Sequence, residues 1–347
     1  MKLNKESREI ARHINDWLND YVPSQKSNSS HTLKSYRDTL SLYIDFLKYK
    51  GIVPSKLCPD CFRRANIEEW IQWLMEKRKC SPETCNNRLA SLRAFLKYLA
   101  DKEISLIYLS LEASAIKRKK VYTKKITGMS KRAVQALLSE PNQSSKTGRR
   151  DLTLFTLMYN TASRIDEILS LKIKDLRLEV NNPHITVVGK GLKIRTLQLL
   201  PRTVSFLKQY LKEFHGERLA GDSFVFYSKT NGLHGKMSQT SINKQLKKYA
   251  ATANIKCNEV PLGLHAHQIR HAKATHWLQD GINIVQISFL LGHVNMETTM
   301  RYLDITTEDE IKALATLENE NDRTLSKKWK AHAVDLSAFC GVRMIRA

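Results

Sequence analysis

The sequence predicts a mainly α-helical protein that carries a small β-sheet and folds as two domains. Three observations support this. Apolar residues recur at helical spacing through much of the first hundred residues, as in an all-helical domain. Residues 117–132 then contain eight Lys or Arg and no acid, a composition typical of a linker. The part that follows mixes helical patterns with two β-rich arms around Gly-Lys-Gly, which favours an α+β domain.

The N-terminal segment contains three predicted amphipathic helices. Residues 31–50 place apolar side chains one helical turn apart, and residues 67–79 and 81–102 show the same pattern. The third segment begins with Ser81, a residue type that caps helix starts. We therefore expect a helical domain over residues 1–113 and a basic linker over 114–128.

The second domain is predicted over residues 129–315, followed by a tail over 316–347. One helix is expected over 151–171 and a β-hairpin over 184–200, because two β-rich arms flank the glycines. Residues 222–228 suggest a further strand. More helices are expected over 238–253, 265–280 and 283–292, and in the segment that holds Tyr302.

Composition indicates a polyanionic partner. Among the 347 residues, 57 are Lys or Arg and 34 are Asp or Glu, so the formal net charge is +23. Nucleic acid is the first candidate and an anionic membrane surface the second. No run of 18 apolar residues exists and the first twenty residues lack a signal-peptide core, so we expect a cytoplasmic protein without a membrane segment.

The cysteines are expected to be reduced thiols, because no secretion signal is present. Cys58, Cys61, Cys80 and Cys85 leave a four-thiolate zinc site open as an alternative, although the second spacing is wider than usual. His267 and His271 lie four residues apart, yet Gln268 stands where a zinc protease needs Glu and Arg270 opposes a cation. We therefore predict no metal at that helix.

Groups suited to binding a phosphate gather at four places: Arg164, Lys190, His267 with Arg270, and His293 with Tyr302. Each alone has an ordinary explanation. Arg164 would pair with Glu167 one turn on, Lys190 would be a solubilising turn residue, and a tyrosine such as Tyr302 is usually half-buried.

The order and spacing of these residues resemble the tyrosine recombinases, the phage-integrase and Xer-like family. The resemblance is specific in "RIDEILSL", "HQIRHAKATHWLQDG" and "LLGHVNMETTMRYLDI", and it covers roughly residues 30–310. Ala162 departs from it at a position where the family often has glycine. The resemblance implies a SAM-like core-binding domain and a catalytic domain that close as a C-shaped clamp around duplex DNA.

The resemblance also implies a set of roles. Arg164 and Arg270 would clamp the scissile phosphate with His293, His267 would act as the base, Lys190 would protonate the leaving oxygen, and Tyr302 would be the nucleophile, with Glu167 in support. From the charge of the linker, separately from the resemblance, further DNA contacts are expected from Lys117, Arg118, Lys119, Lys120, Lys124 and Lys125, with a solvated tether as the alternative. No cofactor is implied.

The expected partners are double-stranded DNA with paired recombinase sites, three further copies of the chain in a homo-tetramer, and accessory DNA-bending or directionality proteins. The tail would dock on a neighbouring subunit, and the protein would lie with the nucleoid of a prokaryotic cell. A type IB topoisomerase and a non-catalytic DNA-binding relative remain as alternatives. The sequence does not select between a phage, a transposon and a chromosome as the element served.

Overall fold

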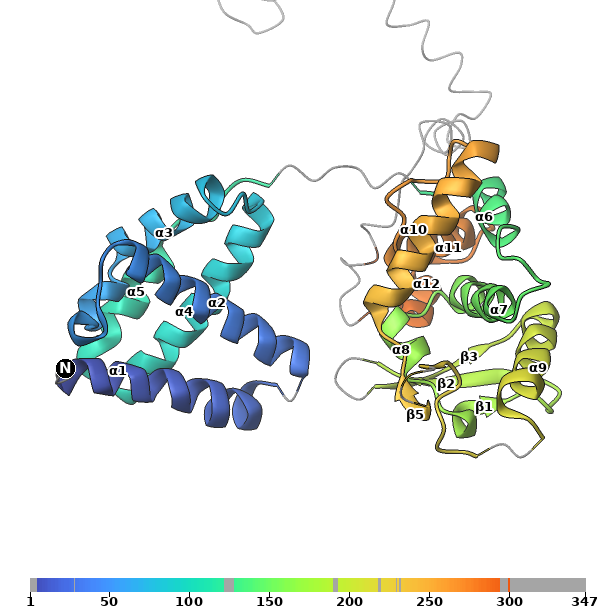
Figure 1. Cartoon of the computed structure of the whole chain (residues 1–347), viewed down its shortest axis with the longest axis horizontal. Coiled ribbons are helices and arrows are strands. Elements are labelled where there is room, and N and C mark those ends of the chain that lie inside the picture. The colour runs from blue at the N-terminus through green and yellow to red at the C-terminus, as the bar shows by residue number, and fades with distance from the viewer. Residues whose placement is uncertain are drawn as a thin grey trace, which may run out of the picture. The chain divides into compact units, whose positions relative to one another are not determined.

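The structure of the protein is a computed structural model that describes residues 5–27, 29–121, 128–189, 193–217, 220–228, 230, 232–293 and 299. The chain divides into two compact units, residues 1–125 and 126–347, which Figure 1 shows with their helices and strands labelled. Each unit has a hydrophobic core of its own. Among the described helices, none combines the length and apolar character needed to cross a lipid bilayer.

The described part of the N-terminal unit is helical. Its elements are α1 (Lys5–Asp16), the π-helical η1 (Trp17–Lys26), α2 (Ser30–Tyr49), η2 (Pro54–Lys56), η3 (Pro59–Phe62), α3 (Arg64–Glu76), α4 (Pro82–Lys102), η4 (Ile104–Leu106) and α5 (Ile107–Ala115).

Aromatic side chains fill the centre of this unit. Trp17, Tyr43, Phe62 and Trp70 are fully buried. The Tyr43 ring stacks on Phe62 with 5.2 Å between centroids, and its hydroxyl donates to the Cys61 carbonyl oxygen at 2.8 Å. Because each such ring removes about 150–250 Å² from water, a few of them suffice to hold short helices together.

Helices α2, α3 and α4 confirm the three predicted in this segment. The Ser81 hydroxyl accepts the Thr84 backbone N–H at 3.3 Å and caps α4, as its residue type indicates. Helices α1 and α5 were not predicted. Helix α1 buries Ser7, Ile10 and His13, a stripe with one apolar member, so apolar periodicity does not reveal it.

The four cysteines of the zinc alternative do not form a metal site. The Cys58 and Cys61 sulfur atoms lie 3.8 Å apart, but no three of His, Cys, Asp or Glu within the described ranges lie close enough to hold a metal ion. Cys85 is buried in α4 and Cys80 precedes that helix, and all four are free thiols.

The second unit combines helices with two small antiparallel sheets, so the predicted mainly α fold with a small β content is confirmed. Its elements are α6 (Lys131–Leu138), α7 (Lys146–Thr161), α8 (Ile165–Leu169), η5 (Ile173–Asp175), β1 (Leu176–Arg177), β2 (His184–Val188), β3 (Ile194–Gln198), α9 (Pro201–His215), β4 (Tyr227–Ser228), β5 (Gly232–Lys236), α10 (Gln239–Lys256), α11 (Ala266–Gln279) and α12 (Ile284–Leu291).

The predicted hairpin is confirmed as β2 and β3, which pair in the order β1-β2-β3 with Val187 opposite Arg195. In Figure 1 this sheet and α9 lie at one end of the unit, α6, α10 and α11 gather at the other, and α7 lies between them. The strand expected over 222–228 is restricted to Tyr227–Ser228, which pairs with β5. Helices α6 and α9 and strands β1 and β5 were not predicted.

The single helix predicted over 151–171 is wrong, because the chain breaks between α7 and α8. Ala162 adopts the left-handed conformation with φ 48° and ψ 24°, and such a residue cannot continue a right-handed helix. Ala162 is fully buried against Ala274, Ile287 and Leu291. Packing therefore holds the break in place, and Arg164 stands at the start of α8 instead of within a longer helix.

Candidate active site

Four of the predicted catalytic residues come together at the ends of three helices. Arg164 is the N-cap of α8, His267 and Arg270 lie in the first turns of α11, and His293 follows Gly292, the C-cap of α12. The start of α11 is fixed locally, because the His265 backbone N–H donates to the Gln268 side chain at 3.0 Å. Helix ends of this kind present side chains at the edge of a packed core.

Arg270 ties these helix ends to one another. It is only 2 % exposed, and its guanidinium donates to the Ala162 carbonyl oxygen at 2.8 Å and to the Leu291 carbonyl oxygen at 2.7 Å. The same guanidinium lies 2.9 Å from Nε2 of His293. Arg270 therefore connects α11 with the end of α7 and the end of α12, and it places a permanent positive charge at their junction.

The hydrogen bonds of His293 define its protonation. Since a guanidinium only donates, Nε2 of His293 accepts from Arg270, and Nδ1–H faces the Thr299 hydroxyl at 2.7 Å. Burial and the neighbouring charge of Arg270 lower the pKa of His293 to about 4. At neutral pH the ring is uncharged and holds Arg270 in position.

His267 faces a cleft of about 360 Å³. Although His267 is exposed at the cleft, neighbouring protein atoms partly shield its ring from water. This burial, and secondly the charge of Arg270, lowers its pKa below 6.5. A neutral imidazole is therefore the dominant form at pH 7 and is ready to accept a proton. The cleft is lined by Ser163, Arg164, Ile165, Asp166, Gln239, Asn243, His265, Ala266, His267 and Arg270.

Glu167 links Arg164 to a second arginine. Its carboxylate accepts from the Arg164 backbone N–H at 2.8 Å and from the Arg164 guanidinium at 3.0 Å. It also accepts two hydrogen bonds from Arg195, at 3.1 and 2.7 Å. Although burial opposes it, the hydrogen bonds from Arg195 and Arg164 lower the pKa of Glu167, so the carboxylate is ionised at neutral pH.

Arg195 was not among the predicted site residues. The signal for it lies in the alternation of β3, where Arg195 shares a face with the buried Leu197 while the apolar Ile194 on the other face is 70 % exposed. An arginine that points toward the core beside an outward isoleucine indicates a buried acceptor, which is Glu167.

Several predicted residues lie outside the described part of the chain. These are Lys190, Tyr302, Lys124, Lys125 and the tail over 316–347. Lys193, the other lysine of the hairpin, is exposed, and its carbonyl oxygen accepts the Gly189 backbone N–H at 2.7 Å.

The described linker residues Lys117, Arg118, Lys119 and Lys120 are all exposed. Lys119 is held on α4, because the Asn86 side chain makes two hydrogen bonds to its backbone, at 2.8 and 2.9 Å. Arg93 of α4 donates to the Ala113 carbonyl oxygen at 2.8 Å, at the end of α5. The start of the basic segment is therefore fixed on α4.

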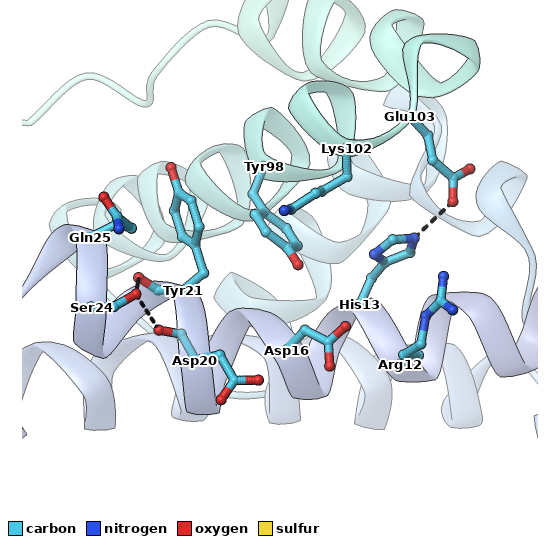
Figure 2. A pocket seen from close by; sticks show the side chains of 10 residues that line it. All are labelled: Arg12, His13, Asp16, Asp20, Tyr21, Ser24, Gln25, Tyr98, Lys102 and Glu103. Carbon is cyan, nitrogen blue, oxygen red and sulfur yellow. Dashed lines mark hydrogen bonds and ion pairs between the residues drawn. The ribbon is translucent and has the colours of Figure 1, made fainter.

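A second cleft, of about 610 Å³, lies in the N-terminal unit between α1, η1 and the end of α4 (Figure 2). Figure 2 shows His13 bonded to Glu103, at 2.8 Å, and the rings of Tyr21 and Tyr98 beside each other. None of the predicted catalytic residues lines this cleft, so the cleft beside His267 remains the candidate active site.

Both units match sequence models of known protein families. Residues 128–309 match the sequence model of the phage integrase family, and residues 12–106 match that of the phage integrase N-terminal SAM-like domain. The tyrosine recombinase XerC of Chlamydia caviae is 28% identical over 303 residues, which cover 83% of this chain and 92% of the relative. The tyrosine recombinase XerD of Staphylococcus saprophyticus is 27% identical over 288 residues, 82% of this chain and 92% of the relative.

Solved structures show the same fold at lower identity. The XerH site-specific recombinase bound to its difH substrate, in a pre-cleavage complex, is 18% identical with a TM-score of 0.67, covering 92% of this chain and 99% of that chain. The Tn1549 transposon integrase in complex with transposon right end DNA is 16% identical with a TM-score of 0.63, covering 86% and 97%.

Proposed function

The chain belongs to the phage integrase family, and from that premise we propose that it is a site-specific DNA recombinase that cleaves and rejoins DNA through a covalent 3′-phosphotyrosyl intermediate. The observation that carries the proposal is the convergence of Arg164, His267, Arg270 and His293 on one cleft and its wall. The element served would be a mobile element or a replicon.

The arginines would bind the scissile phosphate and stabilise its transition state. Charge spreads over the nonbridging oxygens as one oxygen attacks and another leaves, and a guanidinium offers planar, permanently charged donors for them. Arg164 is suited to direct contact, because its side chain is 38% exposed at the cleft. Arg270 would add fixed positive charge from the wall of the cleft.

The nucleophile in this proposal is Tyr302. A phenol has a pKa of about 10, so attack requires a base, and the neutral His267 would take the proton. The Tyr302 oxygen would bond to phosphorus while the bond to the 5′-oxygen breaks. Lys190 would give that departing oxygen its proton.

The phosphotyrosine bond would conserve the energy of the phosphodiester, so religation by a new 5′-hydroxyl would require neither ATP nor a metal ion. Each proton moves between named side chains and the reacting oxygens. We therefore propose a metal- and ATP-independent strand transferase.

The substrate would be duplex DNA with paired binding sites, bound by four copies of the chain. Residues 1–113 would form the core-binding domain and residues 129–315 the catalytic domain. The exposed Lys117, Arg118, Lys119 and Lys120, with Lys124 and Lys125, would contact the phosphate backbone between them. Accessory DNA-bending or directionality proteins and docking of the tail on a neighbour belong to the same proposal.

The test uses nicked duplexes taken from the DNA that flanks the gene, incubated in EDTA and resolved on denaturing gels. We expect a covalent protein–DNA band with the native chain and no band with Tyr302→Phe, while DNA binding persists in both. Absence of the band on DNA that the native chain binds would contradict the proposal and favour a non-catalytic DNA-binding protein. A second assay on plasmids separates recombination from relaxation, since a topoisomerase would yield relaxed circles without exchanged partners.

A further inference from the structure

The Arg195 guanidinium is packed among parts of the chain that carry three different catalytic candidates. Its side chain is 8% exposed, and it makes a bidentate ion pair with Glu167, whose side chain is 5% exposed. Its Nε–H donates to the Leu290 carbonyl oxygen at 3.3 Å, near the end of α12. Three of its N–H groups therefore serve protein acceptors.

Two glycines allow this packing. A Cβ atom added to Gly292 would lie 2.9 Å from Nη1 of Arg195, and one added to Gly189 would lie 3.1 Å from the same atom. Both distances are shorter than ordinary contacts, so a side chain at either position would have to displace the guanidinium. Gly292 immediately precedes His293, and Gly189 immediately precedes Lys190.

The third connection runs through Glu167. Its carboxylate accepts from Arg195 and also from Arg164, so the guanidinium of Arg195 fixes the carboxylate that orients the arginine at the cleft. Charge balance alone does not require this arrangement, because the Arg164 guanidinium already pairs with the Glu167 carboxylate. The cost of taking both charges out of water offsets much of the attraction in a buried ion pair, so stability alone does not account for this pair, and geometry is the further property that it supplies.

We propose that Arg195 is a positioning residue that holds Arg164, the start of the Lys190 loop and His293 in their positions relative to one another. This inference rests on the proposed function and assigns Arg195 no contact with DNA. This role requires the planar guanidinium of arginine, since one rigid group must donate to a carboxylate and a carbonyl oxygen and fit beside two glycines. Lysine keeps the charge but offers a single ammonium group.

The experiment compares Arg195→Lys with Arg177→Lys in the full chain. Arg177 is a matched control because it lies in β1 of the same sheet and donates to the carbonyl oxygens of Lys174 and Leu176, away from the cleft. Three quantities are measured: the single-turnover cleavage rate on nicked DNA, the Kd for that DNA, and the melting temperature.

For Arg195→Lys we expect cleavage to slow by roughly 100-fold, the effect of misplacing catalytic groups by about 1 Å, with DNA affinity within about twofold of the native chain. Arg177→Lys should match the native chain in both. Cleavage by Arg195→Lys within about threefold of the native rate would overturn the positioning role, because the charge would then suffice. An equal fall in affinity and rate would also overturn it.

A second variant covers the case in which Arg195→Lys fails to fold. Gly189→Ala removes no charge, and its new methyl group would press on Nη1 of Arg195 and on Oε1 of Glu167, 3.1 and 3.3 Å away. Gly221→Ala is its control, because a Cβ atom there would make an ordinary contact of 3.6 Å with Lys174.

We expect Gly189→Ala to slow cleavage by about tenfold or more without loss of DNA binding, and Gly221→Ala to leave both unchanged. Native-rate cleavage by Gly189→Ala would overturn the inference. Absence of cleavage by the native chain would overturn the proposed function along with it, whereas a fast Arg195→Lys enzyme would overturn the positioning role alone.

Discussion

The two arginines of the proposed active site should differ sharply in what they contribute to stability. Arg270→Ala leaves the carbonyl oxygens of Ala162 and Leu291 without a charged donor inside the core. Hydrogen bonds to charged groups contribute about 1.5–3 kcal/mol each, so for these two we expect a loss of about 3–6 kcal/mol. Arg164→Ala removes a side chain that is 38% exposed and leaves Glu167 bound by Arg195, so about 1 kcal/mol or less is expected.

Differential scanning calorimetry of the full-length variants measures this difference. For a domain of about 150–250 residues, each kcal/mol shifts the melting temperature by about 2–4 °C, so Arg270→Ala should melt roughly 6–24 °C below the native chain and Arg164→Ala within about 4 °C of it. Both variants should lose cleavage. Melting temperatures that agree within about 2 °C would refute the assignment of Arg270 as the structural link between α7, α11 and α12.

Three further predictions follow from other contacts. Because the pKa of His267 is lowered from 6.5, the single-turnover cleavage rate should stay level at and above pH 6.5 and fall about tenfold per pH unit below the folded pKa. A cleavage rate that already falls with decreasing pH above pH 6.5 would contradict His267 as the base. The folded pKa of Glu167 lies below its usual 4.5, so its ion pair should stabilise the protein fully above that pH and lose effect as the pH falls through the folded value. Urea unfolding from pH 7 to pH 3 should show this loss, and Glu167→Gln should lack it. Asn86→Ala should release the Lys119 backbone and raise the Kd for DNA roughly 2- to 10-fold, since ordering a free segment costs about 0.5–1.5 kcal/mol per side chain. Fluorescence anisotropy at fixed salt measures this Kd. An unchanged Kd would contradict a DNA contact by the linker.

Local patterns predicted those parts of the fold that local interactions decide. Apolar spacing located α2, α3 and α4, and the paired β-rich arms around Gly-Lys-Gly located the hairpin of β2 and β3. The same patterns missed α1, because its buried stripe contains Ser7 and His13. They also joined α7 to α8, because nothing in the composition around Ala162 excludes a continuous helix there.

The sequence by itself determined the family: it shows a basic chain with helical and mixed segments, and an ordered series of Arg, Lys, His and Tyr residues whose spacing points to one family. Only the tertiary structure decided how these residues act together. Contacts between segments distant in the chain produce three features: the left-handed turn at Ala162, the buried bidentate ion pair of Arg195 with Glu167, and the neutral state of His293. Such contacts depend on burial and on electrostatic neighbours, which a one-dimensional pattern does not contain.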